Sequence, residues 1–230
     1  MNRAEFVVAL AAGAASPTSA RPSADIEIKR DSDALLAPFS VAIAVHNPTA
    51  QPIALDFPTA DMYRIDVRRN DDVVWSTATG HKPLLIARRV DVFPGVTRLA
   101  SQIIDGTTDD HRAYAPGRYT VHVAMLSTTL STAIDEPIAF AEPLTIAQAR
   151  GTAGGTVVSV AGTSHTDAGV GELRDVTGSL RLSRPLGRQT TGTYVVRGYL
   201  DAVGDDVQFT VGRFAPAYDN LAAATPPVKP

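Results

Sequence analysis

The sequence predicts an all-β protein with two parts, a sandwich of two packed antiparallel sheets followed by a small β-barrel. Two observations predict this fold class. Bulky apolar residues alternate with polar or small residues through most of the chain, and Asn-Pro, Pro-Gly and Gly-x-Tyr signals interrupt the alternation repeatedly. A period of two is typical of half-buried strands, and frequent turn signals are typical of sandwiches and barrels. A length of 230 residues allows two domains of ordinary size.

The predicted sandwich covers residues 25–146. Its clearest strand is residues 39–45, where every second residue is bulky and apolar. Asn47-Pro48 ends that strand, because proline has no amide hydrogen to donate and asparagine readily bonds its own backbone in a turn. The same alternation predicts further strands at 53–57, 63–67, 73–75, 90–92, 99–103 and 119–125.

Several ordered motifs in this part resemble the BsuPI family of intracellular proteinase inhibitors. They are Val45-x-Asn47-Pro48, Pro52-x-x-Leu55-x-Phe57, Tyr63-x-Ile65-x-Val67, Val73-Val74-Trp75, Pro94-Gly95 and Gly117-x-Tyr119-x-Val121. The resemblance runs from about Ala34 to Thr129 and implies an immunoglobulin-like β-sandwich that inhibits a proteinase. Trp75, the lone tryptophan, is expected in the core, and Tyr119 is similar to a tyrosine corner. After Trp75 the sequence Ser-Thr-Ala-Thr-Gly departs from the aromatic-rich family pattern.

Residues 147–155 are rich in glycine and alanine and are interpreted as a flexible linker. A second β pattern covers 156–218, where glycines indicate sharp bends in a small curled sheet. Asp175-Val-Thr-Gly178 predicts a turn. This second part resembles a small OB-fold barrel, and the Pro-rich tail at 219–230 is predicted to be disordered.

Residues 1–24 are interpreted as a signal peptide or, alternatively, a flexible N-terminus. Arg3 precedes an apolar run at 6–15, and small residues reach Ala20 at a plausible cleavage point. We therefore expect an extracytoplasmic or secreted protein, with an alanine-rich tail on a cytoplasmic protein as the alternative. The apolar run is too short to span a bilayer, so no membrane span is expected.

Composition and charge exclude several functional classes. The absence of cysteine excludes disulfides, thiolate zinc sites and a cysteine nucleophile. A formal net charge of −3 gives no general attraction to phosphate. Residues 156–220 contain six arginines and seven acidic residues, and this balance of charge disfavours nucleic acid as a partner of the barrel. A local basic patch could be formed by Arg181, Arg184 and Arg188, but a solvated strand face is favoured for them. Bases could stack on Tyr194, Tyr199 and Phe209, but ordinary core or sheet-surface positions are favoured for these residues.

No catalytic, cofactor-binding or metal-binding residue is assigned. His165-Thr-Asp167 and Asp109-Asp-His111 pair histidine with carboxylate, but the residues fit polar turns better than a site that would need distant partners. Asp66 with Asp71-Asp72 lacks the ligand spacing of a calcium loop. Gly169-Val-Gly171 is too short for a dinucleotide loop. We therefore expect a protein that is not an enzyme.

The favoured function is a non-enzymatic protein-binding module, for which the resemblance implies a proteinase inhibitor with a protease as partner. The two longest polar loops, Ser76–Leu85 and Thr107–Ala115, are the candidate binding elements, because loops on rigid sheets commonly carry function. Two alternatives stay open at this point. One is an extracytoplasmic structural or adhesion protein built from two β domains. The other, less favoured, is nucleic-acid binding through the barrel.

Overall fold

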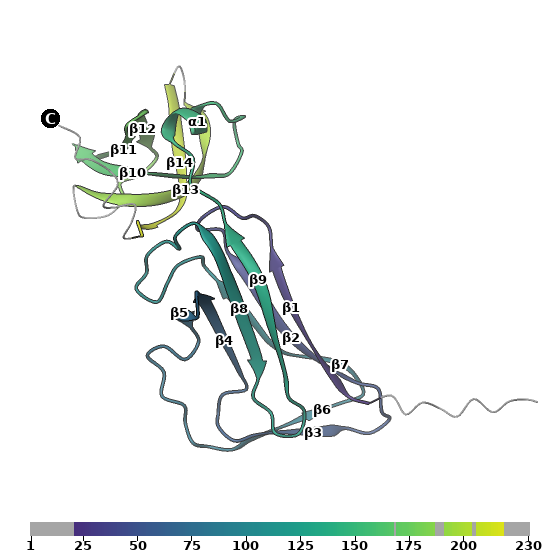
Figure 1. Cartoon of the computed structure of the whole chain (residues 1–230). Helices are drawn as coiled ribbons and strands as arrows, with labels where there is room; N and C mark the ends of the chain where they lie inside the picture. Colours follow the sequence, from purple (N-terminus) through teal and green to yellow (C-terminus); the bar gives the residue numbers. More distant parts are fainter. Residues whose placement is uncertain (1–20, 168, 187–190, 204–205, 219–230) are drawn as a thin grey trace, which may run out of the picture.

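The computed structural model describes residues 21–167, 169–186, 191–203 and 206–218, and it confirms an all-β fold. An elongated body of antiparallel strands carries a closed five-stranded barrel at one end (Figure 1). The body contains β1 (Ser23–Arg30), β2 (Phe39–Asn47), β3 (Ile53–Phe57), β4 (Tyr63–Arg69), β5 (Asp72–Ser76), β6 (Arg88–Val92), β7 (Gly95–Ile104), β8 (Gly117–Met125) and β9 (Thr132–Phe140). The barrel contains β10 (Val158–Asp167), β11 (Val170–Asp175), β12 (Gly178–Leu182), β13 (Thr191–Val203) and β14 (Asp206–Pro216), and helix α1 (Ile146–Arg150) lies between β9 and β10 in the chain.

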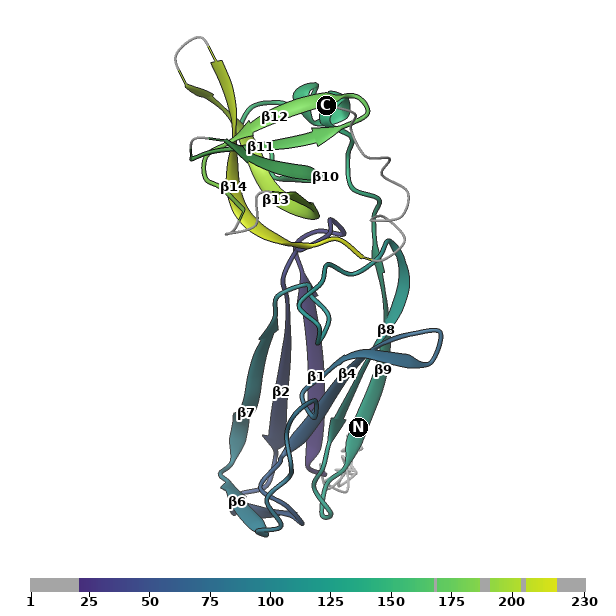
Figure 2. The same cartoon turned by 90° about the vertical axis from the view of Figure 1, so that its left-hand side faces the viewer.

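The body is a sandwich of two sheets with one hydrophobic core between them. One sheet has the order β1-β2-β7, the other has the order β5-β4-β8-β9, and the short pair β3-β6 lies at the end away from the barrel (Figure 1). Figure 2 shows the two larger sheets as separate layers. The predicted strand at 39–45 is confirmed as part of β2, where alternate residues from Phe39 to Val45 are at most 2% exposed.

The Asn-Pro signal after β2 ends the strand as predicted and also connects distant strands. Asn47 is 1% exposed, and its Nδ2 donates to the carbonyl oxygens of Gln51 at 2.8 Å and Val92 at 2.9 Å. Its Oδ1 accepts from the Thr49 amide at 3.0 Å. A buried amide with these partners has its polar atoms satisfied, so Asn47 fixes the turn and holds the end of β6 against it.

The two aromatic residues expected in the core differ in their burial. Tyr119 is 4% exposed, its hydroxyl donates to the Ala115 carbonyl at 2.7 Å, and its ring lies 5.4 Å from the ring of Phe140. The expectation of a tyrosine-corner-like residue is therefore confirmed. Trp75 is only partly buried, which corrects its placement in the core interior. Its strand, β5, is the edge of its sheet, so the indole packs against the core from the periphery.

The barrel closes in the order β10-β11-β12-β14-β13, with β10 pairing back onto β13. Only the β12–β14 pair is parallel among these described strands. A closed barrel of five strands is consistent with the OB-like resemblance. Its core includes Leu173, Leu180 and Phe209, each at most 1% exposed, so Phe209 is a core residue and not a surface platform.

The predicted linker at 147–155 is corrected in its first part, because residues 146–150 form α1. Thr145 and Gln148 form a reciprocal capping box at the start of this helix. The Ile146 amide donates to Asp175 Oδ2 at 2.8 Å, and the Ala147 amide donates to Thr177 Oγ1 at 3.0 Å. Since Ile146 is fully buried with the barrel core, the helix is part of the barrel. The predicted turn at Asp175–Gly178 thus also caps α1.

Barrel and body share a hydrophobic cluster where they meet. Val195, Ala215 and Ala217 of the barrel part are at most 3% exposed and belong to the same cluster as the sandwich core. Across this junction, Ser159 Oγ donates to the Leu35 carbonyl, and the Ala113 amide donates to the Pro216 carbonyl at 3.0 Å. The division of the chain into separable domains therefore stays a prediction, although the two folds are distinct.

Candidate functional site

The two loops proposed from the sequence contact each other in the structure. The segment 77–87, here called the contact loop, connects β5 to β6. Asp109, from the second loop, accepts hydrogen bonds from two residues at the base of the first. The Ser76 amide donates to Asp109 Oδ1 at 3.4 Å, and Thr79 Oγ1 donates to Asp109 Oδ2. The two polar loops thus form one structural unit, which the sequence did not indicate.

Hydrogen bonds hold the contact loop to the body at its base and again near its middle. At the base, the Thr77 amide donates to the Ile65 carbonyl at 3.0 Å, and the Ile65 amide donates to Thr77 Oγ1 at 3.1 Å. Further along, His81 Nε2 lies 3.0 Å from Asp61 Oδ1, and the Ala60 amide donates to the Leu84 carbonyl at 3.0 Å. These contacts come from backbone as well as side chains, so they restrict the path of the loop.

Beyond these attachments, the contact loop exposes three consecutive large apolar side chains. Residues 81–87 form neither helix nor strand, and all of them are exposed. Leu84, Leu85 and Ile86 are 59%, 87% and 64% exposed. A cavity of about 690 Å³ lies between the loop and the body, with Met62, Leu126 and other residues in its walls. Contiguous exposed apolar side chains make this loop a candidate interaction surface.

A buried carboxylate supports the base of the contact loop. Asp66, on β4, has a fully buried side chain and accepts from Ser76 Oγ at 2.7 Å, Arg64 Nε at 2.9 Å and Arg68 Nη2 at 3.0 Å. Ser76 Oγ in turn accepts from the Ala78 amide at 3.0 Å. Burial alone would raise the pKa of Asp66, but the hydrogen bonds from these three side chains outweigh burial and lower that pKa below its ordinary value.

Asp66→Asn is expected to reduce the free energy of unfolding by about 2 kcal/mol at pH 7, because an amide cannot replace a carboxylate that accepts from two guanidinium groups. Since folding lowers this pKa, the stabilisation is present above the unfolded pKa of about 3.9 and is lost as the pH falls through the folded value. The difference in free energy of unfolding between the wild type and Asp66→Asn should therefore shrink below about pH 4. Urea titrations at pH 7 and pH 3 measure it, with the exposed Asp72→Asn as control. An unchanged difference at pH 3 would contradict the assignment.

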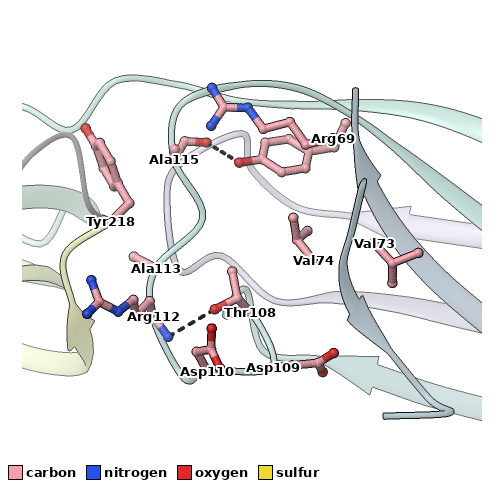
Figure 3. Close-up of a pocket in the computed structure, with 11 residues that line it drawn as sticks. Arg69, Val73, Val74, Thr108, Asp109, Asp110, Arg112, Ala113, Ala115 and Tyr218 are labelled. Atoms are coloured by element: carbon pink, nitrogen blue, oxygen red, sulfur yellow. Dashed lines mark hydrogen bonds between the residues drawn. The ribbon is translucent and has the colours of Figure 1, made fainter. Parts of the chain in front are cut away.

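A second cavity, of about 450 Å³, lies between the loop 107–115, strands β4 and β5, and Tyr218 (Figure 3). Its two arginines contact the surrounding structure. Arg69 Nη2 donates to the Pro116 carbonyl at 3.2 Å with its guanidinium 5.6 Å from the centre of the Tyr119 ring, and Arg112 Nη1 donates to the Ala217 carbonyl at 3.4 Å. Burial raises the pKa of Tyr218 above its ordinary value. These contacts assign the arginines a structural role at the junction with the barrel.

The structure gives the residues of the two histidine–carboxylate pairs roles in turns, strands and loop contacts, and does not gather them into a catalytic site. Asp109 bonds to the contact loop, and His111 lies in a turn at a φ of 59° where its amide donates to the Thr108 carbonyl. His165 on β10 lies opposite Glu172 on β11, its Nε2 is buried without a hydrogen-bond partner, and Asp167 is exposed. No group of three or more His, Asp or Glu side chains that could hold a metal ion occurs within the described ranges.

The remaining candidate residues lie apart from one another or contact other parts of the fold. Asp66 is buried, whereas Asp71 and Asp72 are exposed at the turn between β4 and β5, so the three carboxylates do not gather. Gly169 and Gly171 lie in the hairpin that joins β10 to β11. Arg184 lies over the Phe214 ring at 5.5 Å, and Tyr194 contacts the same ring edge-on at 6.1 Å. Arg181 lies on β12, Tyr199 is half-buried on β13, and Arg188 is outside the described residues.

The β-sandwich holds the contact loop at one of its ends and exposes the apolar side chains of that loop. Residues 24–130 match the family model of BsuPI, the intracellular proteinase inhibitor, so the N-terminal half of the chain contains a BsuPI domain and the resemblance is confirmed. A domain of this kind implies a protease as the kind of partner and an inhibitory role that requires no catalysis. The match ends before α1 and the barrel. A search of curated proteins finds no match.

The family finding corrects the expectation about location. The matching family is described as intracellular, which contradicts the extracytoplasmic or secreted protein inferred from the apolar run near the N-terminus. Residues 1–20 and the tail predicted to be disordered at 219–230 lie outside the described part of the chain. Among the residues that the structure describes, no helix has the length and apolar character needed to cross a membrane.

Proposed function

We propose that the protein is a non-enzymatic binding module that inhibits a protease stoichiometrically by placing its contact loop in the enzyme's substrate cleft. The observation that carries the proposal is the exposed Leu84-Leu85-Ile86 sequence on a segment that the body restrains. An inhibitor that is already held in its binding conformation loses less entropy on association than a mobile peptide does. The BsuPI match supports inhibition as the kind of role.

The chemistry of the contact loop also suggests which protease it fits. Residues 83–87 carry no charge, and Leu85 at 87% exposure is the most exposed of the three aliphatic residues. Extended peptides bind proteins by adding a strand, with main-chain hydrogen bonds for affinity and side-chain pockets for specificity. Three consecutive aliphatic side chains suit apolar pockets, so we propose a serine protease of the subtilisin type as the partner class. Proteases with an acidic pocket for lysine or arginine should fit less well.

Titration of the intact protein against a subtilisin-type protease tests the proposal. The expected result is loss of peptidase activity that reaches completion at a 1:1 molar ratio, with the inhibitor recovered uncleaved by mass spectrometry. The matched comparison is a trypsin-type protease, whose acidic pocket should give weaker inhibition. Absence of saturable inhibition, or digestion of the domain as an ordinary substrate, would contradict the proposal.

A further inference from the structure

We propose that the barrel, which lies outside the BsuPI match, positions the contact loop through the segment Asp105–Ala115, here called the bridge segment. Asp109 is the positioning residue in this arrangement. The inference rests on the proposed function for the role of the contact loop in binding. The positioning itself is a physical property of the free protein and can be measured without a protease.

Three hydrogen bonds join the bridge segment to the last strand of the barrel and to the residue that follows it. The Ala113 amide donates to the Pro216 carbonyl at 3.0 Å, Arg112 Nη1 donates to the Ala217 carbonyl at 3.4 Å, and Arg213 Nη1 donates to the Asp105 carbonyl at 3.2 Å. Apolar packing accompanies them, since Ala113 and Ala217 are 1% and 2% exposed in the shared cluster. The bridge segment is therefore fixed to the barrel by backbone and core contacts, not by surface charges alone.

The bridge segment has a defined internal structure. Thr107 and Ala113 form an antiparallel bridge, and the Thr108 amide donates to the Arg112 carbonyl at 2.9 Å. Gly106 has a φ of 84°, and a Cβ there would lie 2.9 Å from the Leu36 Cα, so the segment packs tightly on the body. The Tyr114 ring is 1% exposed and stacks on Phe140 at 4.9 Å. Packing and hydrogen bonds along the whole segment give a contiguous physical route through which a displacement at one end could reach the other.

At its other end the bridge segment holds the base of the contact loop. The Asp109 amide donates to the Val74 carbonyl at 3.0 Å, and the Asp109 carboxylate accepts from the Ser76 amide and from Thr79 Oγ1. Figure 3 shows Asp109 on the same short segment as Arg112, with Tyr218 on the barrel side and Val74 on the side of β5. A continuous path of contacts thus runs from β14 through Asp109 to Thr79.

The path predicts that loosening the barrel junction increases the mobility of the contact loop. Hydrogen–deuterium exchange of the full-length protein, read at the amides of residues 76–84, measures this directly. Two variants interrupt the path at different points: Ala217→Glu inserts a charge at the junction, and Asp109→Ala removes the acceptor of Ser76 and Thr79. Each has a matched control, the exposed Val176→Glu on the barrel surface and the exposed Asp110→Ala next to Asp109.

We expect exchange at residues 76–84 to accelerate at least tenfold in Ala217→Glu and Asp109→Ala, and to be unchanged in both controls. Asp109→Asn retains a carbonyl acceptor and should recover most of the protection. If Ala217→Glu fails to fold, Arg213→Ala removes an exposed junction contact and should still accelerate exchange. If the Ala113 amide exchanges faster in a junction variant while the amides of residues 76–84 keep their protection from exchange, the positioning role is overturned. That outcome is independent of whether any protease is inhibited, so the failure of one proposal is distinguishable from the failure of the other.

Discussion

Replacing Leu84, Leu85 and Ile86 together by serine is expected to weaken inhibition of a subtilisin-type protease by at least about 1000-fold, which corresponds to about 4 kcal/mol. Burial of each aliphatic side chain in an apolar pocket is worth about 1.5–3 kcal/mol, so three of them supply this loss even if they are only partly buried in the complex. The melting temperature should change little, because these side chains are 59%, 87% and 64% exposed in the free protein. Inhibition titrations and differential scanning calorimetry measure the two quantities.

The matched control for this variant is the replacement of Phe93 and Val96 by serine. Phe93, in the turn between β6 and β7, is 66% exposed, and Val96, at the start of β7, is 74% exposed, so the control removes exposed apolar surface from another part of the body. Its inhibition constant should equal that of the wild type. If both variants lose inhibition equally, the contact is spread over the apolar surface of the body and the contact loop is not its specific site.

Gly198→Ala is expected to destabilise the protein by at least about 3 kcal/mol, since the new methyl group cannot be accommodated without moving backbone. A Cβ at this position would lie 2.0 Å from the Thr210 carbonyl oxygen and 2.7 Å from the Phe209 ring. Gly198 sits where the register between β13 and β14 shifts, the pair with the most extensive contact in the barrel. The substitution therefore forces apart β13 and β14, two neighbouring strands of the closed barrel.

Denaturant titration followed by Trp75 fluorescence gives the measurement. Trp75 is the only tryptophan and lies in the body, so its emission reports the body although the substitution is in the barrel. Because both parts contribute to one hydrophobic cluster, the Trp75 transition should move to lower denaturant in Gly198→Ala. Gly154→Ala, where the nearest atom would be 4.0 Å away, is the control and should stay within about 1 kcal/mol of wild type. A Trp75 transition that is unaffected by Gly198→Ala would show that body and barrel unfold independently.

Local periodicity is enough to predict the fold class and seven of the nine strands of the body, but not β1 (Ser23–Arg30) or β9 (Thr132–Phe140). The alternation in β2 requires one buried face, and Asn47-Pro48 stops a strand for reasons contained in two residues. The glycine at 198 likewise marked a bend that the barrel uses. Helix α1 was missed because its five residues give too short a pattern, although the capping box formed by Thr145 and Gln148 was a readable signal.

The candidate site was only partly predictable, because its residues are brought together by tertiary contacts. The loop Ser76–Leu85 was identified by its length, but its exposed aliphatic residues were not distinguished from its polar first half. No local pattern indicates that Asp66 is buried beneath Ser76, or that Asp109 bonds Thr79. Asp109 and Thr79 are 30 residues apart in the sequence. From the sequence alone, an aspartate in a polar segment is most simply interpreted as part of a solvated turn.

The last strand of the sandwich has a practical consequence for anyone who isolates the inhibitor domain. The family match ends at residue 130, whereas β9 (Thr132–Phe140) pairs with β8 along its whole length, from Gly117↔Phe140 to Met125↔Thr132. A fragment cut at the end of the match would leave β8 as an unprotected edge with open backbone donors and acceptors, a template for aggregation. Expression of such a fragment should yield insoluble or intermolecularly paired material, and failure to inhibit would then say nothing about the contact loop.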